Sequence, residues 1–275
     1  MDRRTYLGGL AGTGIAGLAG CLGTIESQLS GEQPGSGDWG DGETVLDTPT
    51  EDRGTPNHPI YGHEMPSFSF PDPLTGETVS SSDLEGRTYL MTFFFTHCPD
   101  GACPALLLRL RRAQADAIEN GYDNDLALLA MTFDPERDTP EVLETYAGQQ
   151  GVDLEAGNWH FLRPENYESG AQVLREDFGM LLDRIEDEEE LAELEEEHGH
   201  GDDSDGHEDE HSDEHDDGHS DGHDDGHHGH GEYTFVHYNL IFLVNEHGVV
   251  ERSYPNALRT DTETIVEDVR AVTRG

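Results

Sequence analysis

Long apolar runs alternate with amphipathic segments through the middle of the chain. Residues 87–96 (RTYLMTFFFT) and 125–133 (DLALLAMTF) are nearly continuous apolar runs, which is typical of strands buried on both faces. Between them, residues 106–118 repeat apolar side chains at spacings of three and four and end before residues 120–121 (NG), which predicts an amphipathic helix. A second helix is predicted from residue 139 (TPE), with proline in its first turn. This order of strand, helix, strand and helix favours parallel pairing.

Shorter elements follow on both sides of these segments. Phe68 and Phe70 alternate with serine ahead of a turn at 71–76, which indicates a hairpin. Further strands are predicted at 159–162 and at 233–244, and further helices at 167–178 and 261–272. The sequence therefore predicts an α/β domain over residues 59–275, interrupted at 186–231, with a central mixed sheet flanked by helices. This is the layout of a thioredoxin-like fold.

The first residues have the features of an export signal. Arg3-Arg4 precedes a stretch of leucine, glycine and alanine that is too short and too glycine-rich to span a bilayer. The twin arginine resembles a Tat signal, and residues 18–21 (LAGC) resemble a lipobox, whose cysteine is lipid-modified. We therefore expect residues 1–21 to be a Tat-type lipoprotein signal ending at Cys21, with the protein anchored on the extracytoplasmic face of the cell membrane. The alternative is an ordinary cleaved signal with an incidental cysteine.

Composition separates two further segments from the domain. Residues 22–58 contain few large apolar side chains and cannot bury enough surface to offset the entropy of ordering, so they are predicted to form a flexible tether. Residues 186–231 are acidic and of low complexity, and their histidines recur every fourth residue from His207 to His227. We expect a disordered loop beyond a short Glu-rich helical extension near 187–197. Such a loop is either a weak buffer for Cu(II), Zn(II) or Ni(II), or a salt-adapted loop in which histidine happens to repeat.

The formal net charge of −45 indicates adaptation to a salt-rich solvent rather than a binding partner. Residues 186–230 hold 22 acidic residues and no arginine, which leaves −23 for the rest of the chain. All 15 basic residues are arginine, and an acidic, lysine-free composition is typical of proteins from extreme halophiles, where dense carboxylates hold water and salt screens their repulsion. The charge argues against nucleic-acid binding, which needs a basic stripe.

The candidate chemistry lies where the first apolar strand ends. Residues 97–104 (HCPDGACP) place Cys98 and Cys103 directly before the predicted helix at 106–118. Unpaired N–H groups and the macrodipole at a helix N-terminus favour the thiolate, which is both the nucleophile and the soft metal ligand. The alternative is a fixed disulfide between Cys98 and Cys103, which is common outside the cytoplasm.

Three motifs in this order resemble the Sco/SenC family of copper-assembly proteins. The cysteine segment is similar to the family's Cys-Pro-x-x-Cys-Pro turn, residues 133–143 (FDPERDTPEVL) resemble its DPERDTPEVL segment, and residues 233–243 (YTFVHYNLIFL) resemble its histidine before a hydrophobic strand. The resemblance covers roughly residues 65–272 apart from the insertion. It implies copper bound by Cys98, Cys103 and His237, and a partner in the copper-site subunit of cytochrome c oxidase, whose dinuclear copper centre the family helps to load. Two thiolates and an imidazole suit Cu(I), and they hold Cu(II) with a further weak ligand.

The chain departs from the family pattern at two positions. Four residues separate the cysteines instead of three, and Gly101 is expected to absorb the extra residue through a positive φ angle. Val236 replaces the aspartate that usually precedes the histidine, so a partner orienting the imidazole has to come from elsewhere. Asp134 and Asp138 are candidates for polar support of the site, and equally for turn and helix-cap residues.

Three functions are compatible with these sequence features. The first is a copper chaperone for oxidase assembly, and the second is a thiol-disulfide oxidoreductase that exchanges disulfides through Cys98 and Cys103 as catalytic residues. Thioredoxin-like reductases carry a cis-proline facing the active cysteines, but no proline occurs between Pro164 and Pro255, and His237 occupies that region, which favours metal binding. The third is a metal buffer that works mainly through the histidine-rich insertion. A histidine buried in the core and bonded to a backbone carbonyl remains the alternative for His237.

Overall fold

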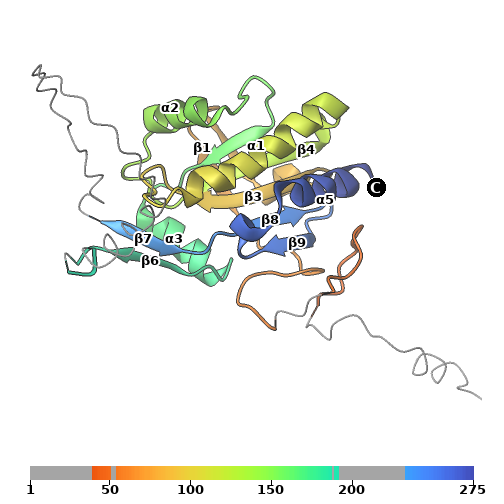
Figure 1. Cartoon of the computed structure of the whole chain (residues 1–275), viewed down its shortest axis with the longest axis horizontal. Helices are drawn as coiled ribbons and strands as arrows, with labels where there is room; N and C mark the ends of the chain where they lie inside the picture. The colour runs from red at the N-terminus through yellow and green to blue at the C-terminus, as the bar shows by residue number, and fades with distance from the viewer. Residues whose placement is uncertain (1–38, 51–53, 188, 192–232) are drawn as a thin grey trace, which may run out of the picture. The chain divides into compact units, whose positions relative to one another are not determined.

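A five-stranded mixed sheet lies at the centre of the computed structural model (Figure 1). Its strands are β3 (Thr88–Phe94), β4 (Leu126–Thr132), β5 (Trp159–Leu162), β8 (Ile241–Val244) and β9 (Val250–Tyr254). In the order β5-β4-β3-β8-β9, the first three strands are parallel, and β8 is antiparallel to both of its neighbours. Every residue of β3 and β4 is buried, as their apolar runs predict. The predicted fold class, a thioredoxin-like α/β fold with a central mixed sheet flanked by helices, is confirmed.

The structure describes residues 39–50, 54–187, 189–191 and 233–275, which all belong to the unit Gly35–Gly275. The predicted signal with Cys21, the first part of the predicted tether and the histidines between 198 and 230 lie outside the described residues. Residues 189–191 are helical, at the start of the predicted Glu-rich extension. Within the described ranges, no helix is long and apolar enough to cross a membrane.

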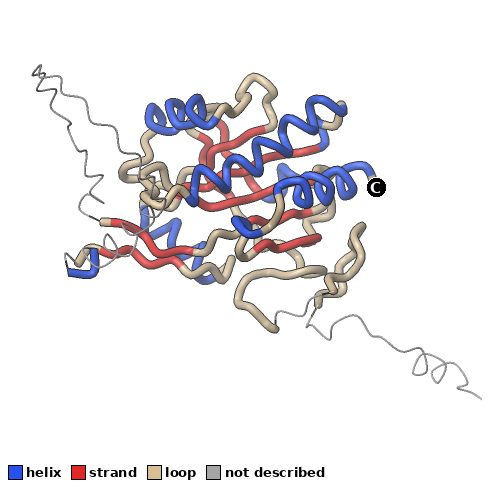
Figure 2. Tube along the Cα trace, in the orientation of Figure 1, coloured by secondary structure: helices blue, strands red, loops and turns tan. Residues whose placement is uncertain are grey.

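Within the described residues, four α-helices of ten or more residues lie around the sheet (Figure 2). They are α1 (Ala102–Asn120), α2 (Pro140–Gln150), α3 (Tyr167–Glu176) and α5 (Thr262–Arg274), with short 3-10 turns at Ser81–Leu84, Asp123–Asp125 and Ala257–Arg259. α1 and α5 lie side by side across one face of the sheet. The buried face of α1 contains Leu106, Leu107 and Leu110, but Ile118, which the spacing placed on that face, is 42% exposed. The helix ends at Gly121 in a left-handed cap, as the Asn-Gly pair predicts.

Two small antiparallel hairpins complete the described structure. β1 (Ser69–Asp72) and β2 (Glu77–Ser80) form the hairpin predicted around the turn at 71–76. β6 (Leu182–Ile185) pairs with β7 (Thr234–His237), although 48 residues (186–233) separate these strands in the sequence. The second hairpin therefore joins the two ends of the insertion.

The prediction of one strand over residues 233–244 is wrong. The chain forms β7 in the small hairpin, leaves it after His237 and re-enters as β8 in the central sheet. At the switch, Tyr238 N–H donates to the Leu181 carbonyl, and the Asn239 carbonyl accepts from Ala257 N–H. The switch falls at His237, Tyr238 and Asn239, between two apolar stretches that are too close together for their pattern to separate two strands. His237 consequently lies at the very end of a strand.

The predicted tether at 22–58 is bound to the domain in its later part. The backbone N–H groups of Val45 and Leu46 donate to the two carboxylate oxygens of Glu251 at 2.8 and 2.9 Å, and Gly40 N–H donates to the Tyr61 carbonyl. Glu251 is fully buried and also accepts from the Asn245 amide at 2.7 Å. A buried carboxylate needs such donors, and the main chain of this segment supplies them. Residues 39–50 are therefore part of the folded structure.

Candidate metal centre

The cysteines lie where β3 passes into α1. Gly101, the residue before α1, has a φ of 72°, the left-handed conformation that glycine adopts without steric cost. This is the positive φ that the extra loop residue requires. Cys103 is in the first turn of α1 and fully buried, whereas Cys98 is half-buried in the preceding loop. Both are free cysteines in this structure.

The start of α1 surrounds the Cys98 sulfur with hydrogen-bonding groups. The Cys103 N–H donates to Cys98 Sγ at 3.3 Å, and the Cys98 thiol lies 2.9 Å from a carboxylate oxygen of Asp100 that also accepts from Ala102 N–H. The Cys103 thiol, helped by the Cys103 backbone N–H, lowers the pKa of Cys98 to about 6. Burial and the neighbouring Cys98 raise the pKa of Cys103 well above its usual value. Near neutral pH the pair therefore holds one thiolate and one thiol.

His237 enters the same space from the end of β7. Its Nε2 lies 3.8 Å from Cys103 Sγ, and its Nδ1 lies 3.0 Å from the Tyr238 carbonyl oxygen. A carbonyl only accepts, so Nδ1 carries the proton and the Nε2 lone pair is free to bind a metal. The backbone of Tyr238 thus does the orienting that an aspartate at position 236 would do, while Val236 is 40% exposed.

Aromatic side chains hold the imidazole in place. Its ring centroid lies 4.8 Å from that of Phe133 and 6.0 Å from that of Phe95, both of which are buried. Phe95 opens the cysteine loop and Phe133 follows β4, so residues adjoining two strands of the central sheet form the wall behind His237. Such rings exclude water and limit the orientations of the imidazole.

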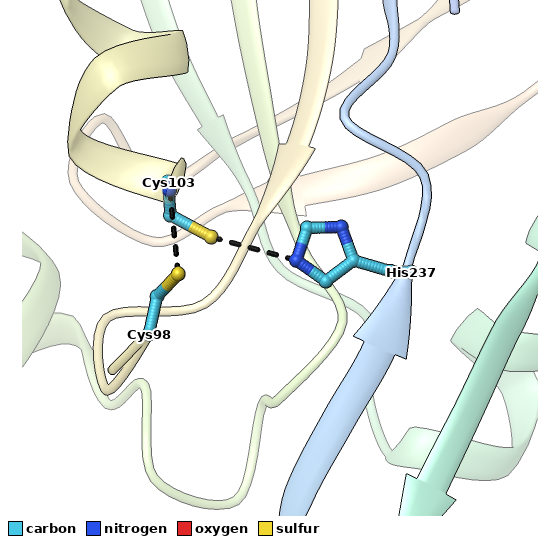
Figure 3. A group of neighbouring side chains, drawn as sticks. All are labelled: Cys98, Cys103 and His237. Atoms are coloured by element: carbon cyan, nitrogen blue, oxygen red, sulfur yellow. Dashed lines mark hydrogen bonds between the residues drawn. The ribbon is translucent and has the colours of Figure 1, made fainter. Parts of the chain in front are cut away.

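The three predicted ligand residues therefore come together. One ligand atom from each of Cys98, Cys103 and His237 lies within 4.8 Å of the other two, and the side chains point toward one another (Figure 3). Bonds of about 2.3 Å to sulfur and about 2.0 Å to nitrogen place two donors of a trigonal site roughly 3.7 Å apart. The 3.8 Å between Cys103 Sγ and His237 Nε2 fits this spacing. The donor set of two sulfurs and one imidazole fits a soft metal ion.

Asp138 holds the start of the cysteine loop through hydrogen bonds to Thr96. It is fully buried, accepts from the Thr96 N–H at 3.3 Å and from the hydroxyls of Thr96 and Thr132. It thus ties the start of the loop to the end of β4. The helix-cap interpretation is wrong for Asp138, because the N-cap of α2 is Thr139, whose hydroxyl accepts from Val142 N–H.

Asp134 supports the other side of the site. It accepts from the Arg137 Nε–H and, at 2.8 Å, from the Tyr233 hydroxyl. The sequence pointed to Asp134 but not to Tyr233, nor to the Tyr238 carbonyl that orients His237. These contacts join segments far apart in the chain, and no local pattern signals them.

Comparison with known proteins finds a family match over the cysteine part of this site. Residues 61–157 match the family model SCO1/SenC. These residues are therefore similar to proteins of the SCO1/SenC family. The match contains both cysteines and residues 133–143, whereas His237 lies beyond its end.

The SCO1/SenC relatives match over a limited length. A protein of Stutzerimonas stutzeri, named as a candidate copper-binding protein, is 40% identical over 67 residues, which are 24% of this chain and 32% of that protein. The chain spans about a third of the length of the first curated relatives that it matches.

Solved SCO1/SenC structures share the fold over a longer stretch. A SCO1/SenC family lipoprotein from Bacillus anthracis str. Ames is 19% identical, with a TM-score of 0.52 over 77% of this chain and 95% of that chain. BsSco, a member of the Sco family of cytochrome c oxidase assembly proteins with a disulfide switch, is 19% identical, with a TM-score of 0.50 over 80% of this chain and 97% of that chain. At this identity the likeness shows the fold.

Proposed function

We propose that the protein is a copper metallochaperone that binds Cu(I) or Cu(II) through Cys98, Cys103 and His237 and helps to assemble the dinuclear copper centre of cytochrome c oxidase. The observation that carries the proposal is the convergence of these three ligand atoms within 4.8 Å. The copper-binding name of the Stutzerimonas stutzeri relative and the oxidase-assembly family of BsSco support the metal and the client.

The geometry suits transfer of copper better than its permanent storage. Three ligands leave a coordination position open, and Cys98 in the loop is accessible while Cys103 is buried. A ligand of the client can therefore coordinate the copper beside Cys98 and His237 before the bond between the copper and Cys103 breaks. The residues of this chain hold the ion, orient the imidazole through Tyr238 and exclude water behind it with Phe95 and Phe133.

The test is a Cu(I) titration of the reduced domain without residues 1–38. We expect one tight copper per domain, weakened in His237→Ala and unchanged by deletion of residues 187–231. Unchanged affinity in His237→Ala would overturn the three-ligand site. Copper binding lost only with the deletion would show that the histidine-rich insertion, proposed here as a weaker buffer for copper, zinc or nickel, is the main binding site.

A second candidate function is thiol-disulfide exchange on the copper-site cysteines of the oxidase. The pKa difference between Cys98 and Cys103 favours it, because a thiolate beside a buried thiol is the arrangement of an exchanging dithiol. The Cys98 thiolate would attack a client disulfide, release one client thiolate and form a mixed disulfide. Cys103 would then attack Cys98 Sγ, release the second client sulfur and form the Cys98–Cys103 disulfide, so that two electrons pass to the client. Cys103→Ser should trap the mixed disulfide with an oxidised client peptide, and failure to trap it would remove this function.

We also propose that the domain works from a lipid anchor at Cys21 on the extracytoplasmic membrane face, after export through the Tat signal at residues 1–21. The lipobox-like residues before Cys21 carry this proposal, and the lipoprotein name of the Bacillus anthracis structure agrees with it. Mass spectrometry of the mature protein should find a lipidated N-terminal Cys21. Release of the protein from membranes by Cys21→Ser is the expected control.

A further inference from the structure

The β6–β7 hairpin has no tight turn to set its register. Hairpins of a few loop residues derive their register from the turn, but here residues 186–233 separate the strands. The observed register pairs Leu182 with His237 and Ile185 with Thr234. Other contacts must therefore choose this register over its neighbours.

A stack of three side chains lies at the end of this hairpin where the insertion leaves β6 and returns to β7. The Arg137 guanidinium lies 3.8 Å from the centre of the Tyr233 ring, and the Arg184 guanidinium lies 3.7 Å from it. At these distances each guanidinium must occupy its own face of the ring. Arg184 belongs to β6, Tyr233 directly precedes β7, and Arg137 comes from the loop after β4. The stack thus joins both strands of the hairpin to the body of the domain.

Two carboxylates on the loop after β4 accept hydrogen bonds from the three residues of the stack. Asp134 accepts from the Tyr233 hydroxyl and from Arg137, and Glu136 accepts from Arg184 at 3.0 Å. Arg137 also donates to the Tyr233 carbonyl at 3.1 Å. Side-chain and main-chain atoms of Tyr233 are therefore both held by one loop, which fixes the position of the residue directly before β7.

Register decides which side chain of β7 meets the cysteines. Phe235 packs on Phe95 and Phe133 at centroid distances of 5.2 and 5.0 Å, and His237 packs two residues later on the same two rings. Successive side chains of a strand point to opposite faces, so a slip by one residue would turn His237 away and bring Val236 or Tyr238 toward Cys103.

We propose that the Arg137–Tyr233–Arg184 stack is a positioning element that sets the register of the β6–β7 hairpin and so aims His237 at Cys98 and Cys103. This inference rests on the proposed role of His237 as a metal ligand. None of the three stack residues touches the metal; they act through the strand that carries the histidine.

The experiment is a double-mutant cycle in the reduced domain without residues 1–38. Cu(I) affinity is measured by competition with a chromogenic chelator in Tyr233→Leu, His237→Ala and the double variant. We expect Tyr233→Leu to lower the affinity roughly 10- to 100-fold, as for lost outer-shell partners of a metal site. It should have no further effect once His237 is replaced. Tyr233→Phe keeps the stacked ring and should remain within about threefold of the wild type, because only the hydroxyl is removed.

Tyr254→Leu is the matched control. Tyr254 is also 7% exposed and also donates its hydroxyl to a carboxylate, that of Asp268 at 2.7 Å, but it lies on the edge strand β9. It should lose thermal stability while its copper affinity stays at the wild-type value. In copper-free protein, the ¹⁵N spectrum of the His237 ring should show the Nδ1–H tautomer in wild type and Tyr254→Leu, and a mixture of tautomers in Tyr233→Leu.

The outcomes separate the two proposals. Wild-type affinity and a wild-type His237 spectrum in folded Tyr233→Leu, or losses that add fully in the double variant, would overturn the positioning role. No effect of His237→Ala would instead overturn the three-ligand site, and the ring spectrum would still decide the positioning role. If Tyr233→Leu does not fold, Arg184→Gln replaces it, since that side chain is 19% exposed and is expected to give the same pattern with a smaller loss.

Discussion

The two halves of the candidate metal centre are built in different ways. The cysteine half is one continuous stretch of chain, from the end of β3 through Gly101 into the first turn of α1. The histidine half arrives on a separate hairpin whose strands are joined by residues 186–233. Local backbone geometry fixes the first half, whereas contacts between distant segments fix the second. A binding site can thus combine a rigid part with a part whose position depends on side-chain packing.

The two halves also differ in the ligand atoms that they supply. The cysteine half supplies both sulfurs, which are the stronger ligands for Cu(I), and the histidine half supplies one nitrogen. The two sulfurs lie on the half whose position follows from local backbone geometry. The imidazole nitrogen lies on the half whose position depends on contacts between distant segments. A client that competes for the copper would therefore replace His237 first.

Replacement of single ligands should give the largest change in Cu(I) affinity. It tests whether the two halves differ in how strongly they bind copper. Cys103→Ser should weaken Cu(I) binding by at least roughly a thousandfold, about 4 kcal/mol, because it removes one of the two sulfur ligands. His237→Ala should weaken it by roughly 10- to 100-fold, because both sulfurs remain. Competition titrations with a Cu(I) chelator measure both, with thermal melts to confirm folding. Equal losses in the two variants would show that the halves do not differ in strength.

The pH dependence of stability tests the connection of the cysteine half to the sheet. Burial raises the pKa of the Asp138 carboxyl to about 6, partly opposed by hydrogen bonds from Thr132 and Thr96. The folded protein therefore binds an extra proton between about pH 4 and pH 6, and the stabilisation from this group is lost as the pH rises through 6. Asp138→Asn mimics the protonated form and lacks this dependence.

Denaturant unfolding at pH 4.5 and pH 7.5, at fixed high salt, should show the effect. Between these pH values, the wild type should lose roughly 2 kcal/mol of unfolding free energy relative to Asp138→Asn. The two proteins share all other carboxylates, so the difference isolates Asp138. Parallel pH profiles for the two proteins would contradict the raised pKa.

Substitution of the glycines at the two ends of α1 should give the smallest changes in stability and copper affinity. It tests whether the shape of the cysteine loop controls copper binding. Gly101 and Gly121 have φ values of 72° and 71°, and an added Cβ at either position meets no atom within 4 Å. Each Gly→Ala substitution should therefore cost about 1 kcal/mol of unfolding free energy from backbone strain alone. Only Gly101→Ala should also lower copper affinity, by several-fold, because only Gly101 shapes the cysteine loop. A similar loss of affinity in Gly121→Ala would mean that general destabilisation, and not loop shape, controls binding.

The sequence predicted the cysteine half well because its information is local. The apolar run of β3 and the positive φ at Gly101 follow from neighbouring residues. The helix was predicted only from residue 106, whereas it begins at Ala102 and includes Cys103 in its first turn. The residues of the ligand set, including His237, were identified through resemblance to known motifs. The structure adds that Cys98, Cys103 and His237 do approach one another.

The histidine half was only partly predictable. Residues 233–244 are mostly aromatic and apolar on both sides of a short polar stretch at 237–239, so the pattern suggested one strand where the structure has two. The roles of Arg184, Tyr233 and the Tyr238 carbonyl depend on three-dimensional proximity, which no spacing rule contains. Glu251 is a similar case, since nothing in its neighbours reveals that its carboxylate binds the backbone of residues 45 and 46.

The bond between Glu251 and the segment at 39–50 limits how far the domain can travel from a membrane. A tether that ran from Cys21 to residue 58 would reach at most about 130 Å when fully extended. With the chain held to the domain from residue 39, the reach falls to about 60 Å. For a domain anchored at Cys21, this shorter reach confines the copper site to a thin layer above the bilayer. A client embedded in the same membrane would then meet the site at a much higher local concentration.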